Sequence, residues 1–368
     1  MPRVKMAFRE EKFDLDIMKE LGDLGVLGCT INGYGCSGVS YVTYGLIARE
    51  VERVDSGYRS AMSVQSSLVM YPISAFGSEE QKQKFLPQLA SGEKIGCFGL
   101  TEPDAGSDPA GMRTFAKKVD GGWLVNGRKI FASLSGAANY YGILCTEDKG
   151  DEHPDARDTL YISVPATSAG FSISGEWDPL GMRGTVSRNL SFKDVFVSDA
   201  EQLMPRGIYF KGAQTWPAMF FTLSPTYLGV ANAAYDFTVQ YLRGEVPGEP
   251  PIKRRQFPTK QIAVAQMRIQ LENMKSIFAR AIAEAKPNPS KDEKMRLYAA
   301  HYSVMEGAND IARLAIRTCG GQSMLKHLPL ERLYRDSRCG ALMLPWTAEL
   351  ILDRMGRETL YEPGEKDA

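Results

Sequence analysis

Hydrophobic positions in the first quarter of the chain recur every three to four residues, a spacing that predicts amphipathic helices. The stretch 12–28 has this pattern and ends in glycine-rich sequence, which predicts a helix and its C-cap. Residues 38–54 and 56–76 predict two further, mostly apolar helices. A fourth helix is expected at 78–90, because Ser78 can cap it and two glutamates follow in its first turn.

The pattern changes between about 95 and 205. Short runs such as 123–133 and 159–166 alternate apolar and polar residues or are rich in β-branched ones, with Gly, Pro and Asp between them. These runs predict a β-domain. Helical spacing returns after 211 and predicts four long helices, at 216–243, 260–285, 291–318 and 330–356.

Helices, then strands, then helices indicate an α+β chain of three domains. We place an N-terminal helical domain at 1–94, a central β-domain at 95–208 and a C-terminal helical domain at 209–368. The sequence contains no internal repeat and no low-complexity tract.

Composition is that of an ordinary globular protein and excludes several function classes. Hydrophobic residues make up 43% and charged residues 24% of the chain. Lysine plus arginine and aspartate plus glutamate both number 44, so no charge excess suggests a nucleic-acid partner. No apolar run is long enough to span a membrane and no signal peptide opens the chain, which favours the cytoplasm.

The cysteines and histidines do not indicate a metal site. Six cysteines lie at scattered positions without a C-x-x-C pair, and we interpret them as buried thiols in a reducing compartment. Three histidines are too few and too dispersed for a histidine-based centre. We therefore expect no metal.

The segment 97–108, CFGLTEPDAGSD, carries the strongest functional signal. It resembles the flavin-contact signature of the acyl-CoA dehydrogenase family. Such a site needs backbone amides and a hydroxyl that reach the isoalloxazine ring, and turn glycines that let the chain pass close to flavin and substrate. The resemblance implies the acyl-CoA dehydrogenase fold and one FAD per chain, contacted here by Phe98, Leu100, Thr101, Gly106 and Ser107.

Two further segments resemble β-domain motifs of the same family. Phe131-Ala132-Ser133 matches a strand that usually carries Trp-Ile-Thr against the ring, so the resemblance adds Phe131 and Ser133 to the flavin contacts. The aromatic ring and the hydroxyl are retained with smaller groups, which leaves more room beside the flavin. Residues 180–187, LGMRGTVS, match the second β-domain motif.

The C-terminal half is similar to the family mainly through isolated motifs. Arg254, Phe257 and Gln261 resemble a segment that reaches the FAD of a neighbouring subunit, which implies a homotetramer or homodimer. Gly320 and Gly321 resemble a turn near the FAD diphosphate, where close backbone approach excludes a Cβ.

Residues 2–108 follow the pattern of the glutaryl-CoA dehydrogenases almost without gaps. There, the arginine matching Arg59 binds the distal carboxylate of the acyl group, and the glutamate matching Glu52 lies close to it. The resemblance implies that Arg59, Glu52, Ser63 and Ser107 contact the substrate. A buried guanidinium needs an anion, so Arg59 with Glu52 is either a structural ion pair or a substrate clamp, and the dense match around them favours the clamp. Members also carry a first helix that we expect to be missing here.

The family's general base is often a glutamate at a position that falls here on Leu344 or, with one inserted residue, on Pro345. Neither side chain can accept a proton. The other known position of the base falls near Met219, in a stretch without any acid. Glu349 follows five residues after Leu344, and we interpret it as a cap or surface residue. The catalytic base is thus unknown, and we expect this chain to keep the fold and the flavin of the family but not its standard reaction.

Three functions remain open. The first is an FAD-dependent oxygenase acting on an acyl-CoA or acyl-carrier-protein thioester, because an electron-rich substrate needs a positioned carboxylate less. Oxygenases of this fold, such as the flavoprotein of bacterial tropone biosynthesis, provide the analogy. The second is dehydrogenation of a glutaryl-like thioester, with or without decarboxylation, by an unrecognised base, with an electron-transfer partner in place of O2. The third is a flavin-binding scaffold without turnover.

Overall fold

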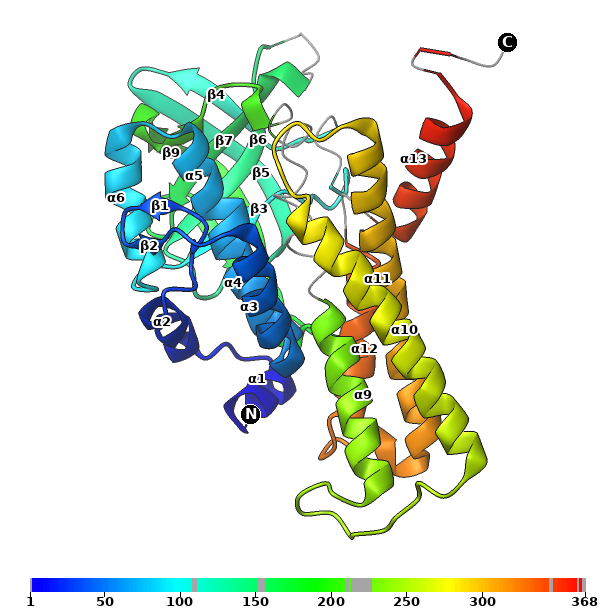
Figure 1. Cartoon of the computed structure of the whole chain (residues 1–368). Helices are drawn as coiled ribbons and strands as arrows, with labels where there is room; N and C mark the ends of the chain where they lie inside the picture. Colours follow the sequence, from blue (N-terminus) through cyan, green and yellow to red (C-terminus); the bar gives the residue numbers. More distant parts are fainter. Residues whose placement is uncertain are drawn as a thin grey trace. The chain divides into compact units, whose positions relative to one another are not determined.

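The computed structural model describes residues 2–107, 111–150, 156–209, 212, 227–343, 347–362 and 364–365. Helices, strands and helices follow one another along the chain, as the periodicity predicts (Figure 1). The chain forms two compact units. The first comprises Met1–Ile47, Gly57–Pro179 and Arg183–Thr222, and the second Ala48–Ser56, Leu180–Met182 and Leu223–Ala368. The α+β class is confirmed, whereas the boundaries near 94 and 208 stay predictions.

The N-terminal helices begin and end close to the predicted bounds, with two differences. The helix expected at 12–28 is shorter, because it is capped by Asp14 and ends before Gly25, whose φ is +69°. A further helix lies before it. The described elements up to residue 90 are α1 (Pro2–Glu10), α2 (Leu15–Asp23), β1 (Asn32–Gly33), β2 (Cys36–Ser37), α3 (Tyr41–Val54), α4 (Ser56–Ser63), η1 (Val64–Met70), α5 (Tyr71–Phe76) and α6 (Glu79–Ala90).

The stretch predicted as one helix at 56–76 contains a π-helical segment, η1, at its centre. Within it the buried Gln65 donates to the carbonyls of Leu89 and Lys94 at 2.8 and 3.0 Å and accepts from the N–H of Gly96 at 2.8 Å. The wider π turn therefore positions a buried amide that joins α6 to the first strand of the sheet. Ser78 caps α6 with a capping box, as expected.

The first unit contains an eight-stranded sheet in the order β10-β7-β6-β4-β5-β9-β8, with β3 paired to β6. Most neighbours are antiparallel, but β3 and β4 run parallel to β6. The strands are β3 (Gly96–Gly99), β4 (Phe115–Val119), β5 (Gly122–Ala132), β6 (Tyr140–Glu147), β7 (Thr159–Pro165), β8 (Phe171–Ser174), β9 (Arg188–Ser198) and β10 (Gln202–Met204).

Strand β5 contains a bulge near its end. Lys129 pairs with Leu190 of β9, but the next pair is Ala132 with Arg188, so two residues of β5 oppose one residue of β9. Phe131, in the bulge, has a φ of +53°, which an aromatic side chain rarely adopts. Bulges occur next to active sites because they turn a side chain in a new direction.

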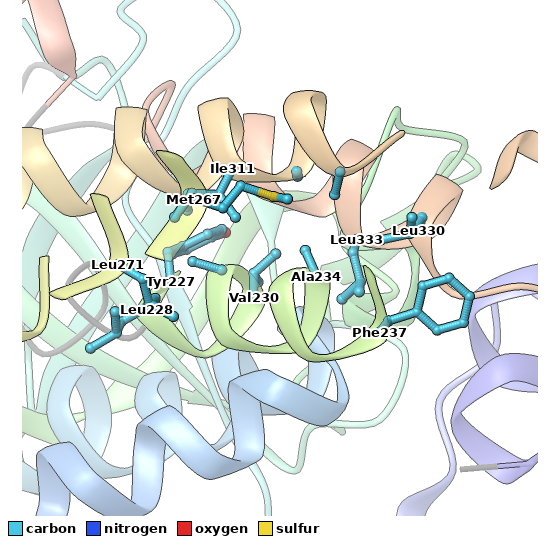
Figure 2. Packing of buried hydrophobic residues seen from close by; sticks show 14 of the residues in the cluster. Tyr227, Leu228, Val230, Ala234, Phe237, Met267, Leu271, Ile311, Leu330 and Leu333 are labelled. Atoms are coloured by element: carbon cyan, nitrogen blue, oxygen red, sulfur yellow. The ribbon is translucent and has the colours of Figure 1, made fainter. Parts of the chain in front are cut away.

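The second unit contains the long C-terminal helices: α9 (Leu228–Arg243), α10 (Pro258–Ala283), α11 (Lys291–Cys319), α12 (Leu330–Gly340) and α13 (Ala348–Leu360). Residues of α9, α10, α11 and α12 build its buried hydrophobic core, with Val230, Met267 and Ile311 fully buried (Figure 2). Burying a side chain of this size contributes about 1.5–3 kcal/mol. Part of the helix expected at 216–243 lies outside the described residues.

The single helix predicted at 330–356 is wrong, because α12 and α13 are separate. Gly340 ends α12 at a crowded position, where a Cβ would lie 2.2 Å from Met305 Cε. Thr347 begins α13 by accepting the N–H of Leu350 at 3.4 Å. A periodicity that continues across both helices hides this break.

Candidate functional site

The loop after β3 is closed on itself and lies beside β5. Glu102 and Gly106 exchange two backbone hydrogen bonds of 2.7 and 3.0 Å, and the hydroxyls of Thr101 and Ser107 lie 2.6 Å apart. Gly106 has a φ of +60°, and no atom of the described residues lies within 4 Å of the place a Cβ would take. The loop thus presents paired hydroxyls and an open backbone, as a cofactor-binding loop requires.

Phe98 and Leu100, which precede these hydroxyls, are anchored in the interior. The ring of Phe98 lies 6.3 Å from that of Tyr209 in a stacked arrangement and 6.0 Å from that of Tyr161. Leu100 is buried and its carbonyl accepts a hydrogen bond from Lys129 at 3.0 Å. Both residues therefore fix the start of the loop.

The bulge of β5 is joined to this loop. Ile130 donates its N–H to the carbonyl of Thr101 at 2.8 Å, so the two predicted flavin segments are direct neighbours. Phe131 is 61% exposed, and its ring meets that of Trp177 edge-on at 5.9 Å between centroids. An aromatic surface is thereby presented next to Thr101. The sequence did not single out Trp177.

A chain of hydroxyls follows the bulge. Ser133 accepts from Ser187 at 3.4 Å, and the hydroxyls of Ser187 and Thr185 lie 3.0 Å apart. Leu134 donates its N–H to the carbonyl of Thr185 at 2.9 Å, which holds the two segments together. Part of the motif at 180–187 therefore lies beside Ser133, as the resemblance implies.

A polar cluster is formed by residues of α3, α4 and η1. Arg59 and Ser63 are fully buried, and Ser63 accepts a hydrogen bond from the hydroxyl of Tyr44 at 3.2 Å. Burial raises the pKa of Tyr44, while Ser63, Ser67 and the charge of Arg59 act in the opposite direction. The sequence predicted Arg59 and Ser63 as substrate contacts, but it gave no signal for Tyr44.

In the second unit, one tyrosine brings together two segments far apart in the sequence. The guanidinium of Arg254 lies 4.6 Å from the ring centroid of Tyr241, and the Tyr241 hydroxyl donates to Gln322 at 3.0 Å. Lys260 donates to the carbonyl of Thr318 at 2.6 Å. The Arg254 segment and the glycine turn after α11 thus lie together at one end of these helices.

The remaining predicted residues of this region are open to contact. Phe257, the N-cap of α10, is 48% exposed, and Gln261 is exposed in the first turn. Gly320 has a φ of +84°, so glycine is required there by conformation. No described atom lies within 4 Å of a Cβ built at Gly320 or Gly321, so the crowding expected there does not come from the described part of this chain.

Three family models match the chain in succession. They are the acyl-CoA dehydrogenase N-terminal domain over residues 1–93, the middle domain over 97–195 and the C-terminal domain over 221–344. The mitochondrial short-chain specific acyl-CoA dehydrogenase of Mus musculus is 30% identical over 342 residues, covering 92% of this chain and 81% of the relative. The chain belongs to the acyl-CoA dehydrogenase family.

Solved structures agree with this assignment. A glutaryl-CoA dehydrogenase from Mycobacterium smegmatis, in complex with FADH2, is 29% identical with a TM-score of 0.87, covering 98% of this chain and 90% of that structure. The butyryl-CoA dehydrogenase of Megasphaera elsdenii is 28% identical with a TM-score of 0.86, covering 98% and 94%. The expected resemblance to glutaryl-CoA dehydrogenase is thus shared with other members of the acyl-CoA dehydrogenase family.

The positions at which the acyl-CoA dehydrogenases carry their general base fall outside the described residues of this chain. Leu344 and Pro345 lie outside the described residues, as does Met219 at the alternative position. Glu349 is exposed in the first turn of α13, which agrees with its interpretation as a surface residue. The loss of the base stays a prediction from the sequence.

Sequence reasoning missed a buried charge cluster in the second unit. Arg332 donates to Asp55 at 3.0 Å and to the carbonyl of Val54 at 2.9 Å, and it lies 3.6 Å from Asp336. Asp336 accepts the N–H of Met182 at 2.7 Å. Burial and the nearby charge of Asp55 raise the pKa of Asp336 to about 7, against the attraction of Arg332. Arg332 and Asp55 are 277 positions apart, and sequence spacing gives no signal for such a cluster.

Glu52 is also fully buried, in the part of α3 that belongs to the second unit. The interpretation of Arg59 and Glu52 as a substrate clamp, and not as a structural ion pair, stays a prediction. Among the residues described, no group of three or more His, Cys, Asp or Glu side chains could hold a metal ion. None of the described helices has the length and apolar character of a membrane span.

Proposed function

We propose that this chain is an FAD-dependent oxidoreductase acting on an acyl thioester. The observation that carries the proposal is the hydrogen bond from Ile130 to Thr101, because it joins the two segments that are predicted to contact the flavin. The names of the relatives support the substrate class, since they are dehydrogenases of CoA thioesters.

The described residues fit a flavin. Thr101 and Ser107 supply hydroxyls from one segment, and Ser133 supplies one from the other. Phe131 offers an exposed aromatic face, and the open side of Gly106 permits close approach. FAD, when bound, supplies two-electron redox chemistry on the acyl group and transfer of electrons to O2 or a protein acceptor.

Arg59 is proposed to bind the distal end of the acyl group. The guanidinium of Arg59 is fully buried, and a carboxylate of the substrate is an anion that suits a buried guanidinium. Ser63 and Tyr44 add hydroxyls within the same helical cluster. These groups suit a carboxylate at the end of the acyl chain, and the proposed substrate is therefore a thioester of a dicarboxylic acid.

For the reaction itself, oxygenation is favoured over dehydrogenation. Abstraction of an α-proton needs a positioned base, and Leu344 or Pro345 occupies the position where the family carries it. Oxygenation, with NAD(P)H as the two-electron reductant and O2 as the oxidant, would not need that base. The competing function is dehydrogenation, which the names of the relatives favour.

Anaerobic stopped-flow reduction tests this choice. The FAD-loaded protein is mixed with glutaryl-CoA under nitrogen, and the flavin absorbance is followed before and after air is admitted. Slow or absent bleaching, with turnover only after a reductant and O2 are added, is the expected result. Rapid bleaching under nitrogen would establish dehydrogenation instead. Absence of flavin binding would refute the whole proposal.

We also propose that the FAD site is completed by a second copy of the chain. Phe257 and Gln261 are exposed, as a segment that serves a neighbouring subunit would be. The lack of crowding at Gly320 and Gly321 leaves room for a cofactor phosphate or a partner backbone.

A further inference from the structure

Lys129 is a fully buried charge between the two flavin segments. Its ammonium donates to Glu102 at 2.7 Å, to the carbonyl of Leu100 at 3.0 Å and to the sulfur of Met112 at 3.6 Å. The side chain is 0% exposed and that of Glu102 is 3% exposed. All three donors of the ammonium therefore have a partner.

Glu102 is held equally firmly. One of its oxygens accepts from Lys129 and from the N–H of Thr114 at 3.0 Å, and the other accepts from the N–H of Arg113 at 2.7 Å. Burial alone would raise the pKa of Glu102. The charge of Lys129 and these hydrogen bonds outweigh burial and hold that pKa below its ordinary value. The carboxylate stays charged at neutral pH.

The sequence around the pair leaves space for it. A Cβ at Gly99 would lie 3.3 Å from the Cγ of Lys129 and 2.7 Å from Ile143 Cδ1, so glycine admits the lysine stem. Lys129 also forms the last regular pair of β5 before the bulge, and the residue after it, Ile130, bonds to Thr101. Lys129 thus contacts the loop through its side chain and adjoins the bulge through its backbone.

A gain in folding stability does not explain the buried ion pair of Lys129 and Glu102. A buried ion pair of this kind is often no more stable than apolar residues of similar volume. Apolar side chains, however, could not hydrogen-bond the carbonyl of Leu100 or the N–H groups of Arg113 and Thr114. The charges therefore serve to fix backbone positions on both sides of Thr101 rather than to add burial.

We propose that Lys129, through Glu102 and Leu100, is a positioning residue for the flavin. This inference rests on the proposed function. Lys129 need not touch the cofactor; it holds the backbone of Leu100 and Thr101 and the bulge at Phe131 in the arrangement that receives the ring. The remainder of the site can fold without it but presents those groups loosely.

The test compares Lys129→Met with Lys149→Met. Lys149 is a matched control, because it pairs at 2.5 Å with Asp158, a carboxylate whose side chain is 3% exposed and which lies outside the flavin segments. Three quantities are measured: the FAD dissociation constant by fluorescence titration, the visible absorption spectrum of bound FAD, and the melting temperature of the apoprotein.

Lys129→Met is expected to weaken FAD binding by about tenfold or more, which corresponds to ~1.4 kcal/mol. The visible band of its bound flavin should also become broader, like that of flavin in water. Lys149→Met is expected to lower the melting temperature of the apoprotein while the FAD constant and spectrum stay those of the parent. Unchanged affinity and spectrum in Lys129→Met would overturn the inference and leave the pair purely structural.

A second variant covers the case in which Lys129→Met does not fold. Glu102→Gln keeps one acceptor oxygen, which can still serve the Lys129 ammonium and the N–H of Thr114, but its NH2 group cannot accept from the N–H of Arg113, and it leaves the ammonium unbalanced. Its FAD affinity should fall and its spectrum should change in the same direction, and unaltered binding would again overturn the inference. If the unmodified protein does not bind FAD, the proposed function fails together with this inference.

Discussion

We predict that Asp336→Asn removes much of the pH dependence of the stability of the protein. Asp336 is fully buried beside Asp55 and Arg332, and Glu52 adds a further negative charge nearby. Its pKa is raised from 3.8 to about 7, with burial as the largest cause. Between these two values the folded protein binds a proton that the unfolded chain has lost.

This bound proton sets the direction in which stability changes with pH. A raised acid pKa makes the contribution of Asp336 to stability fully present below about pH 4 and lost as the pH rises through about 7. Between about pH 5 and about pH 8 the free energy of unfolding of the parent falls by about 3 kcal/mol, because roughly two pH units separate pH 5 from the raised pKa of Asp336. Asparagine stays neutral, keeps an acceptor for the N–H of Met182 and leaves the ion pair of Arg332 with Asp55 in place.

The assay is thermal unfolding of both proteins at the two pH values. An unfolding entropy of about 2.1 cal/mol/K per residue gives about 0.8 kcal/mol/K for 368 residues, so 3 kcal/mol corresponds to about 4 °C. The melting temperature of Asp336→Asn relative to the parent should therefore be about 4 °C higher at about pH 8 than at about pH 5. Asp353→Asn, at an exposed ion pair with Arg357, is the control and should show no such difference. An equal offset of Asp336→Asn at both pH values would refute the reasoning.

Three further predictions concern the site and the assembly. Arg59→Ala should weaken thioester binding by about 3–5 kcal/mol with FAD content near normal, measured by titration of the holoprotein; parallel loss of flavin, or no effect, would make Arg59 structural. Leu344→Glu should increase flavin bleaching by glutaryl-CoA under nitrogen, and no gain would count against the ungapped alignment. The FAD-loaded protein should sediment as a homodimer or homotetramer, with Phe257→Asp weakening both assembly and flavin retention. A yellow monomer at micromolar concentration would contradict a shared site.

The fold could be predicted from the sequence because periodicity and punctuation are local signals. Ser78 caps its helix where expected, and the strands fall between the predicted turn residues. The break between α12 and α13 could not be predicted this way, since the hydrophobic periodicity continues across it. The π segment η1 escaped for another reason: its buried Gln65 bonds to residues 24 to 31 positions away.

The site could be predicted only where a motif is contiguous. Thr101, Ser107 and Phe131 were predicted through resemblance, and in the structure hydrogen bonds join their segments. The partner of Lys129 could not be found in the same way. It lies 27 residues away, and the pairing depends on the route of the loop after β3 and on the bulge in β5. The contacts of Tyr241 with Arg254 and of Trp177 with Phe131 also join residues that are not close in the sequence, so no local pattern predicts them.

The two buried charge clusters share one physical feature, although they belong to different units. In each, a cation donates to a backbone carbonyl: Lys129 to Leu100 and Arg332 to Val54, the last residue of α3. In each, a carboxylate accepts backbone N–H groups, as Asp336 does from Met182. These backbone groups lie at the ends of regular elements or in loops, where helix and sheet partners are missing. Replacing either cluster by hydrophobic residues could preserve the packing and still leave those groups without partners. The charges are therefore best understood as fixing loop backbone, and for the cluster at Lys129 that backbone is the one proposed to receive the flavin.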